Sequence, residues 1–180
     1  MSSAPPEGLV YQPGFLSEDE AGAVLAVVEA MPYEEVVLRG RPARRTVSQY
    51  GYQYDYRGWG ITPTGPLVPV LAWLRDRAGA LAGVDPEALA QALVIRYPAG
   101  AGIGWHRDAP AFGPTVVGVS LLGPARMRFQ RPVDEERSVY EQALEPRSAY
   151  VLSGPARSVW QHSIPAVRAP RYSITFRTVA

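Results

Sequence analysis

The chain has 180 residues, enough for one domain with a substantial core, and 47% of them are hydrophobic, as in ordinary globular proteins. It has no cysteine, which excludes disulfides, zinc–thiolate sites and thiol nucleophiles, and it has no apolar run long enough to cross a bilayer. The formal net charge of +1 excludes a polycation that binds nucleic acid through overall charge alone.

The first 60 residues predict one helix followed by strands. Ser17 with Glu20 three positions later is the pattern of a capping box, which predicts a helix through about Ala30. The run VVLRG, at 36–40, predicts a short strand. In SQYGYQYDY, at 48–56, four tyrosines recur at every second position, which predicts one strand with an aromatic face.

Two more helices precede a β-rich region. The run LVPVLAWLRDRAGAL has helical spacing and ends near Gly83, and Asp85 followed by Pro86 is typical of the cap and first turn of another short helix. From Gln91 onward, short β-rich runs alternate with turns that contain proline, glycine or charged residues. This order predicts an α+β fold in which N-terminal helices precede a jelly-roll β core.

The segment GWHRDAP places His106 and Asp108 two positions apart, so on an extended segment they share one face. A neutral imidazole and a carboxylate are good ligands for a divalent metal. His162, the only other histidine, lies at the end of a predicted strand that a sandwich can bring to the same place. The three residues then form a facial triad with open metal positions. A hydrogen-bonded His–Asp pair without metal is the alternative, and a zinc hydrolase could use the same ligands.

Two arginines mark the last predicted strand, RYSITFR. Arg171 and Arg177 are six residues apart and therefore share a face with Ser173 and Thr175, whereas the opposite face is apolar. Paired guanidinium groups suit a dicarboxylate ligand, because each binds a carboxylate through two hydrogen bonds. The alternative is a pair of arginines that face solvent on an edge strand.

Four segments together resemble the AlkB-like Fe(II)- and 2-oxoglutarate-dependent dioxygenases. In chain order they are RYPAGAGIGWHRD, VVGVSLL, HSIP and RYSITFR, and they cover roughly residues 91–178. The resemblance implies that this part of the chain is a double-stranded β-helix, the jelly-roll core of that family. It also implies that His106, Asp108 and His162 bind Fe(II).

The same resemblance assigns the cosubstrate residues and the reaction. Arg171 is expected to pair with the distal carboxylate of 2-oxoglutarate and Arg177 with the carboxylate next to the keto group. Tyr97 is expected to donate a hydrogen bond to the cosubstrate. The implied reaction consumes O2 and 2-oxoglutarate, gives succinate and CO2, and hydroxylates an N-methyl group, which then leaves as formaldehyde.

Two positions depart from the family pattern. Ile95 stands where the family often has an asparagine that contacts the cosubstrate, so one hydrogen bond is expected to be missing or replaced. Nucleic-acid repair members carry an acidic residue shortly after the position of Asp108, where this chain has Ala109, Pro110 and Ala111. The second departure leaves the iron site intact and bears on the substrate.

We expect the substrate to be an alkylated nucleobase in DNA or RNA, preferably single-stranded. Residues 36–60 hold five arginines against one acid, followed by the tyrosines, and are expected to form a lid over the iron. In this lid, Arg44 and Arg45 would contact phosphates, and Tyr50 and Tyr52 would stack on bases. The alternative is a basic loop that leads into an ordinary strand whose tyrosines pack on the core.

Two further functions remain open. The same chemistry could act on a protein side chain or a modified tRNA, which Pro110 and the near-neutral net charge favour. A catalytically inactive jelly-roll binding module is the other alternative, against which the complete triad and both arginines argue. The first ten residues lack a signal-peptide pattern. We therefore expect one domain over residues 1–180, in the cytoplasm, as a monomer without a membrane partner.

Overall fold

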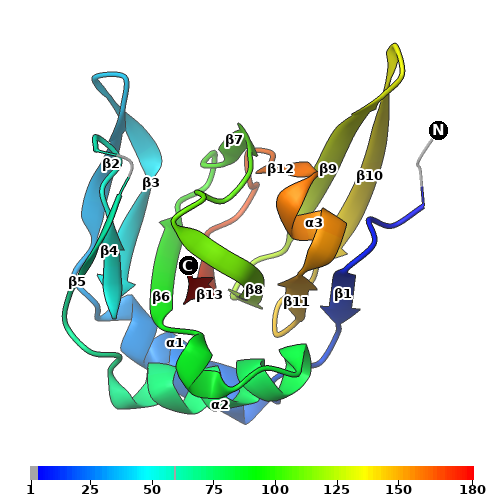
Figure 1. Cartoon of the computed structure of the whole chain (residues 1–180). Helices are drawn as coiled ribbons and strands as arrows, with labels where there is room; N and C mark the ends of the chain where they lie inside the picture. The colour runs from blue at the N-terminus through cyan, green and yellow to red at the C-terminus, as the bar shows by residue number, and fades with distance from the viewer. Residues whose placement is uncertain (1–3, 59) are drawn as a thin grey trace.

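The computed structural model describes residues 4–58 and 60–180. Two antiparallel sheets face each other, and α-helices cover one of them (Figure 1). In chain order the elements are β1 (Leu9–Gln12), α1 (Glu18–Glu29), β2 (Glu34–Leu38), β3 (Arg41–Tyr50), β4 (Tyr52–Tyr54), β5 (Ile61–Pro63), α2 (Pro69–Ala82), the 3-10 turn η1 (Pro86–Ala88), β6 (Gln91–Tyr97), β7 (Ile103–His106), β8 (Phe112–Leu121), β9 (Ala125–Val133), β10 (Glu136–Leu144), β11 (Ala149–Leu152), α3 (Gly154–Ser158), β12 (Gln161–Ile164) and β13 (Arg171–Val179).

The strand order is that of a double-stranded β-helix. One sheet has the order β1-β11-β8-β13-β6-β3-β2 and the other β10-β9-β12-β7, while β4 and β5 form a separate hairpin. Of the eight strands from β6 to β13, four lie next to one another in the larger sheet and the other four make up the smaller sheet. The predicted jelly-roll fold with N-terminal helices is therefore confirmed. Among the described residues, no helix combines the length and apolarity that a membrane crossing requires.

The helices pack on the outer face of the larger sheet. The capping box at Ser17 and Glu20 forms with both of its hydrogen bonds, so α1 begins where the sequence predicted. Helix α2 ends at Gly83, whose φ of +70° is the left-handed conformation that glycine adopts readily. Val28 of α1 and Leu74 of α2 belong to the core beneath the sheet. Burial of these apolar side chains stabilises the helices against the sheet.

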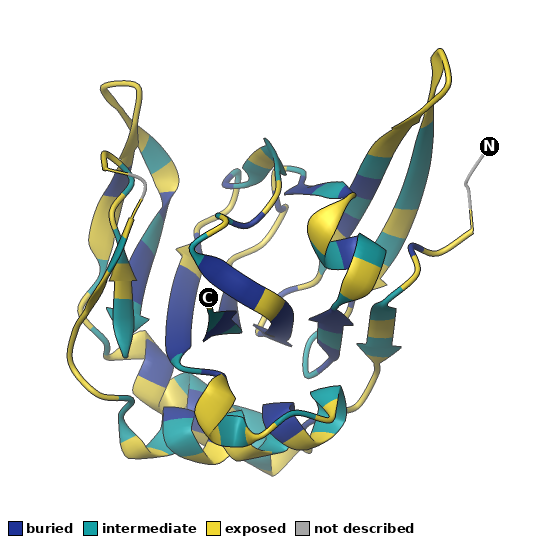
Figure 2. Ribbon diagram, viewed as in Figure 1, coloured by how far each residue is buried: buried dark blue, intermediate teal, exposed yellow. Residues whose placement is uncertain are grey.

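Alternation along β13 gives the larger sheet its two faces. Ile174 and Phe176 point toward the helices and join the core there. The odd-numbered residues from Arg171 to Arg177 line a cavity between the two sheets instead. Because β13 lies between β8 and β6 in the middle of the sheet, the alternative of an exposed edge strand is wrong. Figure 2 shows the buried central strands and the exposed hairpin tips around them.

The prediction of one aromatic-faced strand over 48–56 is wrong. Gly51 has a φ of +77°, its amide donates to the carbonyl of Gly65, and a Cβ at this position would collide with the carbonyl of Ala90. The chain therefore turns at Gly51, and the tyrosines are divided between β3 and β4. Strands β1 and β7 were not predicted, and the run SVWQHSI begins in the last residue of α3 before β12.

The region predicted as a lid, 36–60, has two parts. Residues 46–50 of β3 pair with residues 92–96 of β6, so this end of β3 extends the core sheet. The turn between β2 and β3, at Arg39 and Gly40, projects away from the sheet on one side of the molecule. The β9–β10 hairpin projects on the opposite side, and β7 and β12 lie between the two (Figure 1). Trp59, also in the predicted lid, lies outside the described residues.

Candidate metal centre and cosubstrate pocket

The smaller sheet brings the two histidines together. His106 ends β7 and pairs directly with His162 on the neighbouring strand β12. Asp108 follows two residues after the end of β7, in a loop, and its Oδ1 lies 3.6 Å from His106 Nε2 and 3.5 Å from His162 Nε2. The three side chains offer ligand atoms that all lie within 4.8 Å of one another. The two distances from Asp108 fit atoms that share one metal at about 2.0–2.2 Å from each of them.

The donor set fits Fe(II), since two imidazole nitrogens and one carboxylate on one side of a metal leave its other positions open. Burial raises the pKa of Asp108, but the Arg177 charge and hydrogen bonds with both histidines outweigh this effect and hold the pKa well below its usual value. Burial lowers the pKa of His162. At neutral pH the carboxylate is therefore ionised and His162 is neutral, as metal ligation requires.

Arg177 lies directly beside the triad. Its Nε donates to Asp108 Oδ2 over 2.9 Å, and another guanidinium nitrogen donates to Gln91 Oε1 over 3.1 Å. The guanidinium carbon also lies 4.6 Å from the centre of the Phe112 ring. Burial lowers the pKa of Arg177, but the Asp108 carboxylate outweighs this and raises it. Arg177 thus holds one oxygen of Asp108 and leaves Oδ1 to face the histidines.

Arg171 is a buried cation with no acidic partner among the described residues. The residue is only 1% exposed, it donates to Ser120 Oγ over 2.9 Å, and its Nε has no hydrogen-bond partner in the described part of the chain. The Tyr97 ring, from the neighbouring β6, lies 4.8 Å from the guanidinium carbon. A buried charge is costly unless it is paired. The arrangement therefore favours an anion beside Arg171.

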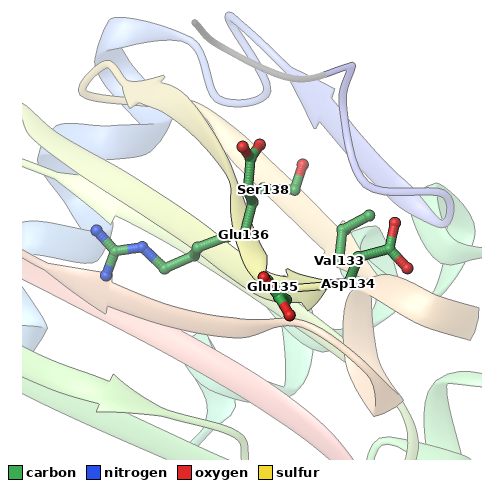
Figure 3. Close-up of a pocket in the computed structure, with 6 residues that line it drawn as sticks. Val133, Asp134, Glu135, Glu136 and Ser138 are labelled. Carbon is green, nitrogen blue, oxygen red and sulfur yellow. The ribbon is translucent and has the colours of Figure 1, made fainter.

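One cavity between the sheets contains the triad and both arginines. Its remaining wall is mostly apolar and includes Ile95, Ile103, Met127, Leu144, Tyr150 and Ile164. Ile95 points into this cavity with a hydrocarbon side chain, so it offers no hydrogen bond there. A second hollow, at the tip of the β9–β10 hairpin, is lined by Asp134, Glu135, Glu136 and Arg137 among others (Figure 3), and it shares no lining residue with this cavity.

Sequence patterns missed Arg157, which organises the loop that carries Asp108. Its guanidinium donates to the carbonyl oxygens of Asp108, Ala109, Phe112 and Gly113, at 3.0–3.1 Å. Arg157 lies on α3, just before the strand that carries His162. It therefore connects the two segments that supply the candidate ligands. No local pattern reveals this role, because its four acceptors are backbone atoms 44–49 residues away.

A series of aromatic contacts leads from Arg177 to β4. The Tyr54 ring lies 5.8 Å from Phe112 and 4.9 Å from Tyr56, and Phe112 in turn contacts Arg177. Tyr54 and Tyr56 share the period-two pattern of the predicted strand, which was the available signal. Phe112 had none.

The four predicted substrate residues lie in different environments. Arg44 is exposed, whereas Arg45 is buried and donates to the carbonyl of Gly102 over 3.3 Å. Tyr50 packs against the core beneath the helices, and its hydroxyl accepts from Ser48 over 3.0 Å. Tyr52 is half-buried on β4. Arg44 and Tyr52 therefore remain accessible, while Arg45 and Tyr50 are engaged in the fold.

Comparisons with known proteins agree with this architecture. The model of the 2OG-Fe(II) oxygenase superfamily matches residues 8–177. The chain is 29% identical over 181 residues to the alkylated DNA repair protein ALKBH8 homolog of Arabidopsis thaliana, covering 88% of this chain and 51% of that protein. It is 27% identical over 172 residues to the tRNA (carboxymethyluridine(34)-5-O)-methyltransferase alkbh8 of Xenopus tropicalis, covering 91% of this chain and 26% of that protein.

The fold is also similar to a solved structure. The structure of OsALKBH1 superposes with a TM-score of 0.75 at 18% identity, over 98% of this chain and 99% of that chain. The chain spans about half the length of the Arabidopsis relative, and less of the Xenopus one.

Proposed function

Because the chain belongs to the 2OG-Fe(II) oxygenase superfamily and is AlkB-like, we propose that it oxidatively dealkylates N-alkylated nucleobases in DNA or RNA. Fe(II), 2-oxoglutarate and O2 are the cofactors of this superfamily. The observation that carries the proposal is one cavity that holds a His–Asp–His cluster, the buried Arg171 and the largely buried Arg177. A zinc hydrolase needs the metal ligands but has no use for the arginine pair.

In this proposal, His106, Asp108 and His162 hold the iron. Arg171 binds the distal carboxylate of 2-oxoglutarate with Tyr97 beside it, and Arg177 binds the carboxylate next to the keto group. Bound in this cavity, the iron, 2-oxoglutarate and O2 supply the oxidising chemistry, which gives succinate and CO2 and hydroxylates the N-alkyl carbon, with release of formaldehyde from an N-methyl group.

The chain's own residues orient the reactants and exclude water. Arg177 fixes one carboxylate oxygen of Asp108, and Arg157 fixes the backbone of the same loop. Apolar walls, such as Ile103 and Leu144, keep water from the cosubstrate pocket. A dry pocket strengthens the ion pairs on which cosubstrate binding depends.

The substrate part of the proposal rests on the lid, 36–60. Arg39, Arg41, Arg44 and Arg57 are exposed there and would contact phosphates. Tyr54 and Tyr52, both half-buried on β4, are the better stacking candidates, and the Tyr54 ring contacts Phe112, which in turn contacts Arg177. The tip of the β9–β10 hairpin carries three acids against one arginine, Arg137 (Figure 3), and would repel phosphates, so a nucleic-acid strand is expected to follow the arginines of the lid instead.

A protein side chain or a modified tRNA is the second candidate substrate. Ala109, Pro110 and Ala111 follow Asp108, and the carbonyl of Ala109 is bound to Arg157, so this loop offers the substrate no acidic side chain. Of the described residues that line the cavity, only Asp108 is acidic. The names of the two relatives likewise differ in substrate, with alkylated DNA for one and tRNA for the other.

Mass spectrometry of methylated oligonucleotides tests the proposal. Single-stranded and duplex DNA and RNA are incubated with the protein, Fe(II), 2-oxoglutarate and ascorbate, with His162→Ala as the inactive control. We expect loss of the methyl group from single strands together with formation of succinate. Succinate without demethylation would refute the nucleobase substrate and favour the second candidate. Absence of succinate with every substrate, despite bound metal, would leave only the inactive binding module.

A further inference from the structure

A tyrosine that no sequence pattern singled out reaches the cosubstrate pocket. Tyr150 lies on β11, where it pairs with Gly118 of β8. A Cβ built on Gly118 would collide with the ring and the hydroxyl oxygen of Tyr150. Glycine within a strand is typical of a place where another group approaches the backbone closely. Here it leaves room for the phenol to lie over β8 and to line the cavity between the sheets.

The Tyr150 hydroxyl lies among the charged groups of the site. Asp108, Arg171 and Arg177 are close enough to act on it electrostatically, as is Tyr97. Tyr150 makes no hydrogen bond through this hydroxyl with any described residue. Burial raises its pKa, so the hydroxyl keeps its proton at neutral pH and is a hydrogen-bond donor. A donor of this kind, in a mostly apolar pocket, is suited to an anionic acceptor.

Two features place that acceptor beside Arg171 rather than Arg177. Arg177 already has Asp108 as an anionic partner, whereas Arg171 has no acid, and its buried Nε has no partner among the described residues. Tyr97 and Tyr150 both act on the Arg171 guanidinium from the cavity side. The phenols of Tyr97 and Tyr150 and the guanidinium of Arg171 can therefore surround a single carboxylate, and we call these three groups the cradle.

Ile95 explains why this cradle needs a second phenol. Ile95 faces the same cavity from β6, two residues before Tyr97, and cannot donate a hydrogen bond. The strand β6 therefore supplies one cosubstrate donor, Tyr97. Strand β11, from the other side of β13, supplies another.

We propose that the Tyr150 hydroxyl donates a hydrogen bond to the distal carboxylate of 2-oxoglutarate, beside Arg171, and so replaces the donor that Ile95 lacks. This inference rests on the proposed function, because it needs 2-oxoglutarate as the ligand. Tyr150 is then a determinant of cosubstrate selectivity, since its hydrogen bond distinguishes 2-oxo acids with a distal carboxylate from those without one.

Titration calorimetry without oxygen tests this inference independently of turnover. The Mn(II)-loaded protein is titrated with 2-oxoglutarate and with 2-oxovalerate, in which a methyl group replaces the distal carboxylate. Tyr150→Phe keeps the ring and removes the hydroxyl. Tyr140→Phe is the matched control, because the Tyr140 hydroxyl donates to Gln142 and its ring packs on Phe129 outside the cavity lining.

We expect Tyr150→Phe to weaken 2-oxoglutarate binding roughly 10- to 100-fold, as for loss of one hydrogen bond to a charged group. Binding of 2-oxovalerate should stay unchanged, and Tyr140→Phe should affect neither ligand. Unchanged 2-oxoglutarate binding, or an equal loss for both 2-oxo acids, would overturn the assignment of Tyr150 alone. If the wild-type protein binds Mn(II) but not 2-oxoglutarate, the proposed function fails, and the role of Tyr150 fails with it.

Discussion

Replacing Arg157 by alanine is expected to weaken metal binding, although Arg157 is not a ligand. The substitution removes four hydrogen bonds to the loop at residues 108–113. Loss of groups that orient metal ligands typically lowers metal affinity about 10- to 100-fold. The free energy of four hydrogen bonds from a charged group corresponds to a larger loss of affinity than that, but the freed carbonyl groups can partly bind water instead. We therefore expect a loss at the upper end, about 100-fold.

Titration with Mn(II), followed by calorimetry, measures this effect directly. Arg157→Lys keeps the charge but not the planar fork, so it should recover only part of the affinity. Arg107→Ala is the control, because exposed Arg107 makes a single long hydrogen bond of 3.4 Å to the carbonyl of Ser158. Wild-type affinity in a folded Arg157→Ala variant would refute the reasoning, and so would equal losses in Arg157→Ala and Arg107→Ala.

Four further substitutions address other parts of the proposal. Arg171→Ala should weaken 2-oxoglutarate binding by about 2–5 kcal/mol in calorimetry, with metal affinity intact. An unchanged dissociation constant for 2-oxoglutarate would show that Arg171 does not bind it. Metal at 100 times its Kd should stabilise the wild type by about 2.7 kcal/mol and so raise its melting temperature, and His162→Ala should abolish this rise; a retained rise would place the metal elsewhere. Arg44→Ala should flatten the salt dependence of oligonucleotide binding. Arg45→Ala should chiefly lower the melting temperature, because Arg45 is buried. Equal effects of the two substitutions would contradict the assignment of exposed Arg44, and not buried Arg45, to phosphate binding.

Local patterns predicted the parts of the fold whose cause lies within a few residues. The capping box at Ser17 and Glu20 specifies the start of a helix through adjacent hydrogen bonds. Alternation along RYSITFR separates the arginines from the apolar residues whether or not the partner strands are known. The pairing of His106 with His162 was anticipated only as proximity, because their register is fixed by strands β7 and β12 together.

The missed features depend on contacts distant in sequence. Gly51 turns the chain because the backbone of Gly65 and Ala90 surrounds it, which no period-two pattern contains. The burial of Arg45 requires the carbonyl of Gly102, and the position of the Tyr150 ring requires the absence of a side chain at Gly118. Such residues have ordinary local sequence and acquire their roles only when the sheets form.

The direct pairing of His106 with His162 has a mechanical consequence. Among the described strands, β7 lies at the edge of the smaller sheet, spans four residues and has β12 as its only neighbour. Short edge strands with few partners open locally at low energetic cost. A cation bound to both histidines joins the strands by a bond outside the backbone ladder, so ligation opposes this fraying. With the proposed ligand set, this part of the pocket is therefore expected to open less readily when the metal is bound than when it is not.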